Sequence, residues 1–258
     1  MTTIYQHFRS EEKGFIDQVL NWKEQVEQTY APKLTDFLDP REQEILKVII
    51  GKNTEVRCQL FGGYQGAERQ RALVYPDYYI PEEEDYQLTL FEVDYPKKFI
   101  KIEHPQVLGS LMSLGLKRSK FGDLLFKEAD IQMIVSSEIA DYLSMQLESI
   151  GRASVKLKVL PLNDASSVSD QWQERVITAT SLRLDTIVAS IYNLSRQKAQ
   201  TYIQSKLVKV NWSSLENPAF ECREGDMISV RGQGRSKIIV IEGKTKKAKW
   251  KVVAGLQK

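Results

Sequence analysis

The spacing of apolar residues predicts two helices and two strands in the first 76 residues of the chain. The expected elements are helices over 15–26 and 40–49 and strands over 55–61 and 71–75. The second helix has a well-marked start, because Asp39 can cap it, Pro40 suits its first position and Glu42 completes a capping box. Residues 1–76 are therefore expected to fold as a small α/β domain.

From residue 86 the pattern alternates between strands and helices. The expected order is a strand over 86–95, a helix over 104–116, strands over 123–128 and 131–136, a helix over 137–150 and a strand over 154–160. This β-α-β-β-α-β series is the ferredoxin-like arrangement of RRM folds, so residues 77–161 are expected to form an RRM-like domain. The third strand lacks the aromatic rings with which RRM domains stack RNA bases. The strands therefore do not predict RNA binding by this domain.

A polar, turn-rich run follows, and residues 162–180 are expected to be a linker. Residues 181–258 then carry two short amphipathic helices and several strands, which predicts a compact C-terminal domain. The final hairpin places Lys247, Lys249 and Lys251 on one face, which fits a basic binding surface and an edge strand protected by lysines equally well. The whole chain is expected to be an α+β protein with three domains.

Charge is distributed unevenly along the 258 residues. Residues 1–180 carry 21 Lys and Arg against 28 Asp and Glu, whereas residues 181–258 carry 15 against 6. A basic module with a net charge of +9 indicates a polyanionic partner. Nucleic acid is favoured over an anionic membrane, because the chain has no Lys-rich amphipathic helix with an aromatic face.

The composition excludes several other classes of protein. Two distant cysteines, Cys58 and Cys222, cannot build a disulfide framework or a structural zinc cluster. No apolar run is long enough for a signal peptide or a membrane span. We therefore expect a cytoplasmic protein with no membrane partner, no metal and no cofactor.

The second C-terminal helix has an unusual first turn. Ser195 is placed to cap it, but Arg196 and Lys198 follow where acidic residues would suit the helix dipole. Cations and free N–H groups at one helix end favour a bound phosphate, so we expect a nucleic-acid backbone there. Gln197 and Gln200 lie on the exposed side and could contact sugars or bases, although an ordinary polar helix face would look the same.

Four short motifs occur in this region: RLD at 183–185, LSRQKA at 194–199, VKVN at 208–211 and REGDMISV at 223–230. In combination they resemble the S4 RNA-binding domain. The resemblance implies an αα hairpin followed by a small β-sheet that binds structured RNA. The contacts it implies are Arg183, Ser195, Arg196, Gln197, Lys198, Gln200, Lys206, Lys209 and Asn211. The chain departs from the pattern at Ser205 and Lys206 and at Trp212, where glycines are usual.

The segment 104–125 is similar to a signature of the YlmH family, whose members join an RRM-like domain to a C-terminal S4 domain. Three cations in this segment, Lys117, Arg118 and Lys120, would then form a second RNA contact. A structural explanation carries equal weight, because cations that follow a helix end are favoured by its dipole.

No constellation of residues predicts catalysis. The chain has only two histidines and lacks a nucleophile elbow and a phosphate-binding loop. The RLD at 183–185 also resembles the aspartate motif of pseudouridine synthases, but Asp185 is not followed by the expected TSG and no large domain follows the S4-like module. Asp185 is expected to cap a helix, and the protein is not expected to be an enzyme. An RNA-modifying enzyme of pseudouridine-synthase type is the alternative.

These observations together predict a non-catalytic RNA-binding protein. We expect it to dock on ribosomal RNA of the large subunit, with tRNA as a further contact. The family resemblance implies a role in translation or ribosome quality control. The acidic portion, residues 1–180, would face away from RNA or toward a protein partner.

Overall fold

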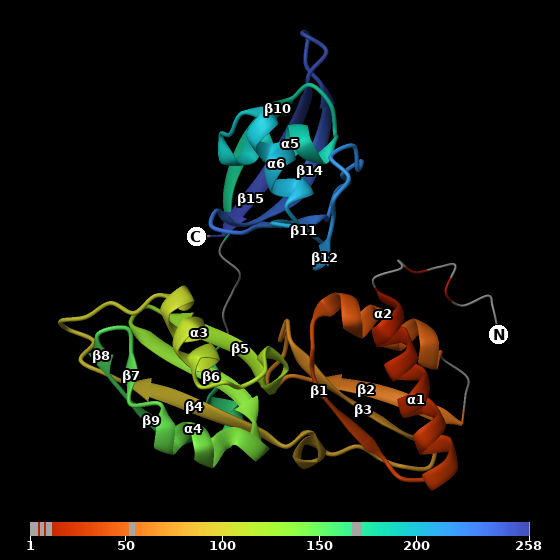
Figure 1. Ribbon diagram of the computed structural model, residues 1–258, viewed down its shortest axis with the longest axis vertical. Coiled ribbons are helices and arrows are strands. Elements are labelled where there is room, and N and C mark those ends of the chain that lie inside the picture. Colours follow the sequence, from red (N-terminus) through yellow and green to blue (C-terminus); the bar gives the residue numbers. More distant parts are fainter. Residues whose placement is uncertain (1–4, 6–7, 9–11, 52–54, 167–171, 258) are drawn as a thin grey trace. The chain divides into compact units, whose positions relative to one another are not determined.

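The computed structural model describes residues 5, 8, 12–51, 55–166 and 172–257. The chain folds into two compact units, Met1–Val168 (unit 1) and Ser169–Lys258 (unit 2). Figure 1 shows the helices and strands of both units.

The first half of unit 1 is a three-stranded sheet with two helices on one face (Figure 1). Its elements are α1 (Lys13–Thr29), β1 (Lys33–Leu38), α2 (Pro40–Ile50), β2 (Val56–Phe61) and β3 (Gln70–Pro76). The sheet order is β1-β3-β2 and both pairings are antiparallel. The predicted capping box of α2 is confirmed, since Asp39 accepts from the N–H of Glu42 and Glu42 accepts from the N–H of Asp39.

The second half of unit 1 has the predicted ferredoxin-like order of elements. They are β4 (Leu88–Asp94), α3 (His104–Ser113), β5 (Phe121–Lys127), β6 (Asp130–Ser136), α4 (Ala140–Gln146) and β9 (Lys156–Leu160), with a small hairpin of β7 (Ser149–Ile150) and β8 (Ala153–Ser154). The antiparallel sheet runs β5-β6-β4-β9, so the first and third strands of the series are central. Short 3₁₀ turns lie at Glu83–Tyr86, Arg118–Lys120, Ser137–Ile139 and Leu162–Asp164.

The two halves of unit 1 pack tightly against each other. Phe37 of β1 packs with Leu90, Leu125 and Ile134 of the second sheet, apart from the cluster beneath α3 and α4. Gly122 permits this approach, because a Cβ there would lie 2.7 Å from the Phe37 ring. The sheet face that an RRM uses to stack bases is thus partly covered by the first half, which accounts for its missing aromatic rings.

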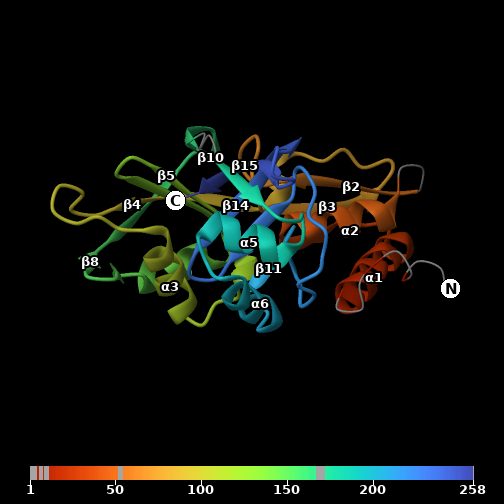
Figure 2. The same cartoon turned by 90° about the horizontal axis from the view of Figure 1, so that it is seen from above.

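Unit 2 is a six-stranded sheet with two helices packed together against it (Figure 2). Its elements are β10 (Gln173–Ala179), α5 (Leu184–Tyr192), α6 (Arg196–Gln204), β11 (Val208–Val210), β12 (Ser213–Ser214), β13 (Met227–Val230), β14 (Gly234–Lys244) and β15 (Trp250–Gln257). The sheet order is β10-β15-β14-β13-β11-β12. The core joins apolar residues of α5 and α6 to those of the strands, as the sequence pattern predicts.

Strand β10 lies inside the segment predicted to be a linker, so residues 173–179 of that segment belong to the sheet. It pairs with β15 over seven residues, from Gln173 opposite Leu256 to Ala179 opposite Trp250. Only Ile177 and Ala179 of β10 are buried, and this weak apolar pattern explains why the sequence did not reveal it. Because β15 lies between β10 and β14, it is not an edge strand, so the second interpretation of the lysine row, protection of an edge, is wrong.

Candidate nucleic-acid interface

The first turns of α5 and α6 meet at one buried carboxylate, that of Asp185. Its Oδ2 accepts hydrogen bonds from Nε of Arg196 at 3.0 Å and from Nε2 of Gln200 at 2.8 Å. Arg183 donates to both carboxylate oxygens, at 3.2 and 3.3 Å, and the Thr186 hydroxyl donates to Oδ1 at 3.2 Å. We call these five residues the Asp185 cluster.

The Asp185 carboxyl is held in its ionised form. Burial alone would raise its pKa, but the hydrogen bonds from Arg183, Gln200 and Arg196 outweigh burial and hold the pKa well below its usual value. The side chains of Arg183 and Arg196 are 40% and 56% exposed, whereas that of Asp185 has no exposed surface. Asp185 therefore orients two cations that still face solvent.

This geometry corrects two predictions. Asp185 does not cap α5, because Arg183 is the N-cap residue and Asp185 lies within the first turn. Arg196 does not need an external phosphate to balance its charge, because Asp185 of the same chain supplies the anion. The predicted cap of α6 is confirmed, since Ser195 Oγ accepts from the N–H of Lys198 at 3.2 Å.

Besides Ser195 and Arg196, four further implied RNA contacts have exposed side chains: Gln197 and Lys198 on α6, Lys206 just after it and Lys209 on β11. Lys198 lies 5.8 Å from the centroid of the Tyr202 ring, and Lys206 pairs with Glu216 at 2.9 Å. Within the part of the chain that the structure describes, Lys198 and Lys209 form no ion pair. Lys198 lies on the exposed side of α6, whereas Lys209 lies on β11 between Val208 and Val210, which pack into the core with the helices, so its side chain is on the other face of the strand.

The side chain of Asn211 has a structural role, which explains its presence at this position without an RNA contact. Its Nδ2 donates to Asp226 at 2.8 Å, and its Oδ1 accepts from the N–H of Met227 at 2.9 Å. Both ends of the side-chain amide are thus engaged within unit 2, where they join the end of β11 to the start of β13.

The backbone keeps a glycine-like geometry at Lys206 and Trp212, two positions where the S4 pattern usually has glycine. Their φ angles are 59° and 63°, in the left-handed region. Lys206 ends α6 in a Schellman motif, in which the N–H of Leu207 bonds to the carbonyl of Tyr202. Asn211 and Trp212 form the two-residue turn between β11 and β12, and Asn211 also has a left-handed φ, of 48°. The turns that glycine usually permits are therefore formed here by Lys206 and Trp212, at the cost of a strained backbone at these two residues.

The second implied contact, in unit 1, is mostly engaged within the fold. Lys120 pairs with Asp36 at 2.6 Å and with Glu138 at 2.5 Å. These hydrogen bonds raise the pKa of Lys120 although burial acts to lower it. Arg118 donates to the carbonyl of Phe121 at 2.6 Å, and of the three only Lys117 is exposed. The structural explanation accounts for Arg118 and Lys120.

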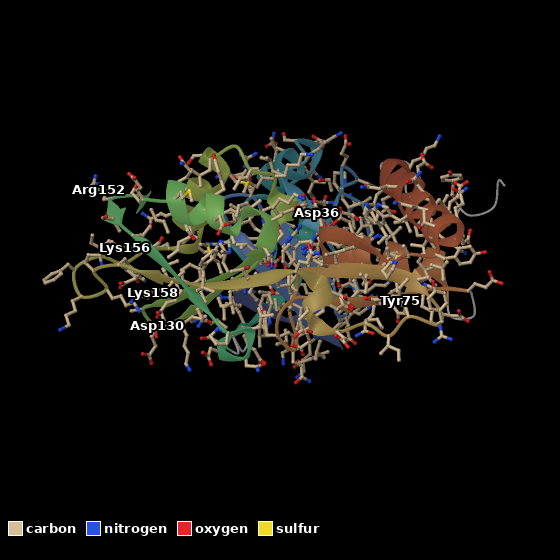
Figure 3. The ribbon with its side chains drawn as sticks, turned by 90° about the horizontal axis from the view of Figure 1, so that it is seen from below. Asp36, Tyr75, Asp130, Arg152, Lys156 and Lys158 are labelled. Atoms are coloured by element: carbon tan, nitrogen blue, oxygen red, sulfur yellow. The ribbon has the colours of Figure 1, made fainter. Side chains whose placement is uncertain are left out.

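Three other cations of unit 1, which belong to none of the motifs described above, form a row. Arg152, Lys156 and Lys158 are exposed along the turn after β7 and the outer strand β9, and Figure 3 labels all three. Lys158 pairs with Asp94 at 3.0 Å. The alternation Lys-Leu-Lys over 156–158 was the available signal, since it places both lysines on one face of a strand.

No group of three or more His, Cys, Asp or Glu side chains that could hold a metal occurs among the described residues. Burial raises the pKa of the Cys222 thiol to about 12, which makes it unreactive. No helix in the described ranges is long and apolar enough to cross a membrane.

Three family profiles match the chain. The profile "YlmH, N-terminal" matches residues 11–79, "Putative RNA-binding domain in YlmH" matches 81–164 and the S4 domain profile matches 182–228. The chain belongs to the YlmH family. The resemblance found in its sequence motifs is thereby confirmed, and the S4 profile spans the residues that form the Asp185 cluster.

A relative within the YlmH family comes from Bacillus subtilis (strain 168) and is named "Ribosome-associated protein quality control protein P2". It is 48% identical over 258 residues, which is 100% of both chains. A solved structure named "Cell division protein ylmH from Streptococcus pneumoniae" is 35% identical, with a TM-score of 0.54, and the match covers 62% of this chain and 97% of that chain. The match to the solved structure and the S4 profile together confirm the α+β fold with a C-terminal S4 domain.

Proposed function

We propose that this YlmH-family protein is a non-catalytic RNA-binding protein that docks on ribosomal RNA of the large subunit and contacts tRNA. The observation that carries the proposal is the α5–α6 surface, where Arg183 and Arg196, oriented by Asp185, are partly exposed and Lys198 is exposed on the same turn of α6 as Arg196. Lys209 adds an exposed cation on strand β11, and neither lysine forms an ion pair among the described residues. The name of the full-length Bacillus subtilis relative supports a role on ribosomes in protein quality control. Work on ribosomes would place the protein in the cytoplasm.

The proposed mechanism is contact with phosphates, with recognition by shape. Asp185 occupies Nε of Arg196, which leaves the rest of a partly exposed guanidinium to bind a phosphate oxygen. Lys198 in the first turn of α6 and Lys209 on β11 add point charges, and Gln197 of α6 adds a neutral donor and acceptor. Because the arginines are already oriented, binding orders fewer side chains and costs less entropy.

Unit 1 contributes a second surface to this proposal. Its ferredoxin-like half matches a profile named for RNA binding, and Arg152, Lys156 and Lys158 are its exposed row of cations. Since the central sheet face is covered by Phe37 and its neighbours, we place RNA on the outer strand β9. The acidic charge of residues 1–180 would keep the other faces of unit 1 away from RNA or turn them toward a protein partner.

The enzyme alternative requires Asp185 to act as a nucleophile. Its carboxylate has no exposed surface and accepts from Arg183, Thr186, Arg196 and Gln200, so an RNA base cannot reach it in this arrangement. We therefore favour the non-catalytic function. Sequencing the modified nucleotides of ribosomal RNA incubated with the protein tests this choice, and uridine isomerisation that Asp185→Asn abolishes would favour the enzyme.

The docking proposal is tested by pelleting the full chain with purified ribosomal subunits. We expect the protein to sediment with large subunits at low salt and not with small subunits, and binding to increase when tRNA occupies the large subunit. Equal sedimentation with both subunits would contradict the large-subunit site, and no sedimentation with either would contradict ribosome docking.

A further inference from the structure

The connection between β14 and β15 is the most strongly basic segment of unit 2. Residues 244–251, which we call the hairpin tip, read KTKKAKWK and contain five lysines in eight positions. Glu242 is the only acidic residue between 240 and 258. The S4 profile ends at residue 228, so the hairpin tip lies outside the matched domain.

The hairpin tip has a defined conformation. Its turn is closed by hydrogen bonds from the N–H of Thr245 to the carbonyl of Lys249 at 2.7 Å and from the N–H of Ala248 to the carbonyl of Thr245 at 2.9 Å. Ala248 adopts a left-handed φ of 56°, and Lys244 pairs with Trp250 at the base of the turn. Figure 1 shows the tip, in dark blue, projecting beyond the rest of unit 2.

The fold does not neutralise the charge of the hairpin tip. Lys251 pairs with Glu242 at 2.5 Å, and Nζ of Lys244 lies 5.1 Å from the centroid of the Trp250 ring. Lys246, Lys247 and Lys249 are exposed and form no ion pair in the ranges the structure describes. Like charges held close together on a hairpin repel one another, so the unbound protein gains no stability from this arrangement.

Protection of a sheet edge does not explain these lysines. Strand β15 lies between β10 and β14, and the outer strands of the sheet are β10 and β12. Lys246, Lys247 and Lys249 lie in the turn, beyond the last paired residues Lys244 and Trp250. They therefore cannot prevent pairing with another strand.

We propose that the hairpin tip is a further RNA-backbone contact of unit 2, separate from the α5–α6 surface, with phosphate groups as its ligands. This inference rests on the proposed function and extends it to a second site on the same unit. Lysine suits phosphate as a mobile point charge with three donors. A membrane or protein interface would require apolar side chains to insert, but Trp250 is half-buried beneath Lys244 and Ala248 is the only other apolar residue of the tip.

The test compares full-chain variants for binding to 23S ribosomal RNA over a range of salt concentrations. In the tip variant, Lys246→Gln, Lys247→Gln and Lys249→Gln remove three charges from exposed positions. A control with Lys13→Gln, Lys23→Gln and Lys47→Gln removes three charges from α1 and α2 in the acidic half of the chain. We expect the tip variant to bind more weakly and its slope of log affinity against log salt to fall by about two, at roughly 0.7 to 0.9 per lost contact, while the control keeps the wild-type slope.

A Lys198→Gln, Lys209→Gln variant separates this inference from the proposed function. If it lowers the salt slope while the tip variant keeps the wild-type slope, the tip contact is wrong and RNA binding by α5–α6 stands. If the wild-type chain does not bind the RNA, the proposed function fails first. Loss of binding to phosphatidylglycerol vesicles by the tip variant, with an unchanged RNA slope, would overturn the RNA contact in favour of a membrane surface. Equal melting temperatures of the tip variant and wild type establish that folding is intact.

Discussion

Arg196 donates through Nε to Oδ2 of Asp185 at 3.0 Å, and this ion pair joins the first turns of α5 and α6 through a carboxylate with no exposed surface. A buried charge that loses its partners is strongly destabilising. The Asp185 cluster therefore links two properties of unit 2, because the same hydrogen bonds stabilise the helix pair and orient its arginines.

Replacing Asp185 with asparagine should destabilise unit 2. The amide keeps the shape of the carboxylate but cannot match the charge-assisted hydrogen bonds from Arg183 and Arg196, so the free energy of unfolding should fall by about 2 kcal/mol. Urea unfolding measures this change. Glu216→Gln is the matched control, since the exposed Lys206–Glu216 pair should contribute less than about 1 kcal/mol. Equal losses in the two variants would contradict the role of the cluster.

Stability should also depend on pH through Asp185. Its pKa is lowered in the folded state, so its stabilisation is complete above the unfolded pKa of about 3.9 and is lost as pH falls from there toward the folded value. The difference in unfolding free energy between wild type and Asp185→Asn should therefore be constant near pH 7 and shrink below about pH 4. If this difference in unfolding free energy grew as the pH fell, it would contradict a lowered pKa of Asp185 in the folded state.

Lys206→Gly should stabilise the protein modestly. Glycine removes the cost of a left-handed backbone, about 1 kcal/mol, whereas the lost ion pair with Glu216 is exposed and worth less. An increase in melting temperature of a few degrees is expected. Lys209→Gly is the comparison, because Lys209 lies in strand β11, where glycine should lower the stability of the protein. A lower melting temperature for Lys206→Gly would contradict the assignment of strain.

Arg196 and Lys198 are neighbours in the first turn of α6 but should respond differently to alanine. Arg196→Ala removes a donor from buried Asp185 and should lower the unfolding free energy by about 1 to 3 kcal/mol. Lys198→Ala removes an exposed cation from a helix start and should leave stability unchanged or slightly improved. Thermal unfolding of the two variants is the measurement, and identical effects would contradict the geometry of the cluster.

The sequence predicts elements with strong local signals. The capping box of Asp39 and Glu42 marks the start of α2, and the order of apolar strand-like and helix-like segments from residue 86 onward predicts the ferredoxin-like half. Strand β10 escaped prediction because it has few buried positions and its partner, β15, lies more than 70 residues further along the chain. Pairing of this kind depends on tertiary contacts that no local pattern records.

The candidate site could be predicted only in part, because its geometry also depends on tertiary contacts. Net charge and the S4 motifs locate the basic module, but which of its polar side chains face solvent depends on packing. Arg196 and Gln200 are four residues apart and so share one side of α6, yet nothing in their spacing shows that Asp185 of α5 lies beneath them. Asn211 likewise has the appearance of a polar RNA contact in the sequence, but in the structure its side chain joins the end of β11 to the start of β13.

The salt dependence of binding to 23S ribosomal RNA tests the central claim most directly, which is that exposed cations of α6 and β11 contact RNA phosphates. For Lys198→Gln with Lys209→Gln, we predict a slope of log affinity against log salt that is lower than that of wild type by about 1.5, with an unchanged melting temperature. An equal slope in the folded double variant and the wild type would contradict the account.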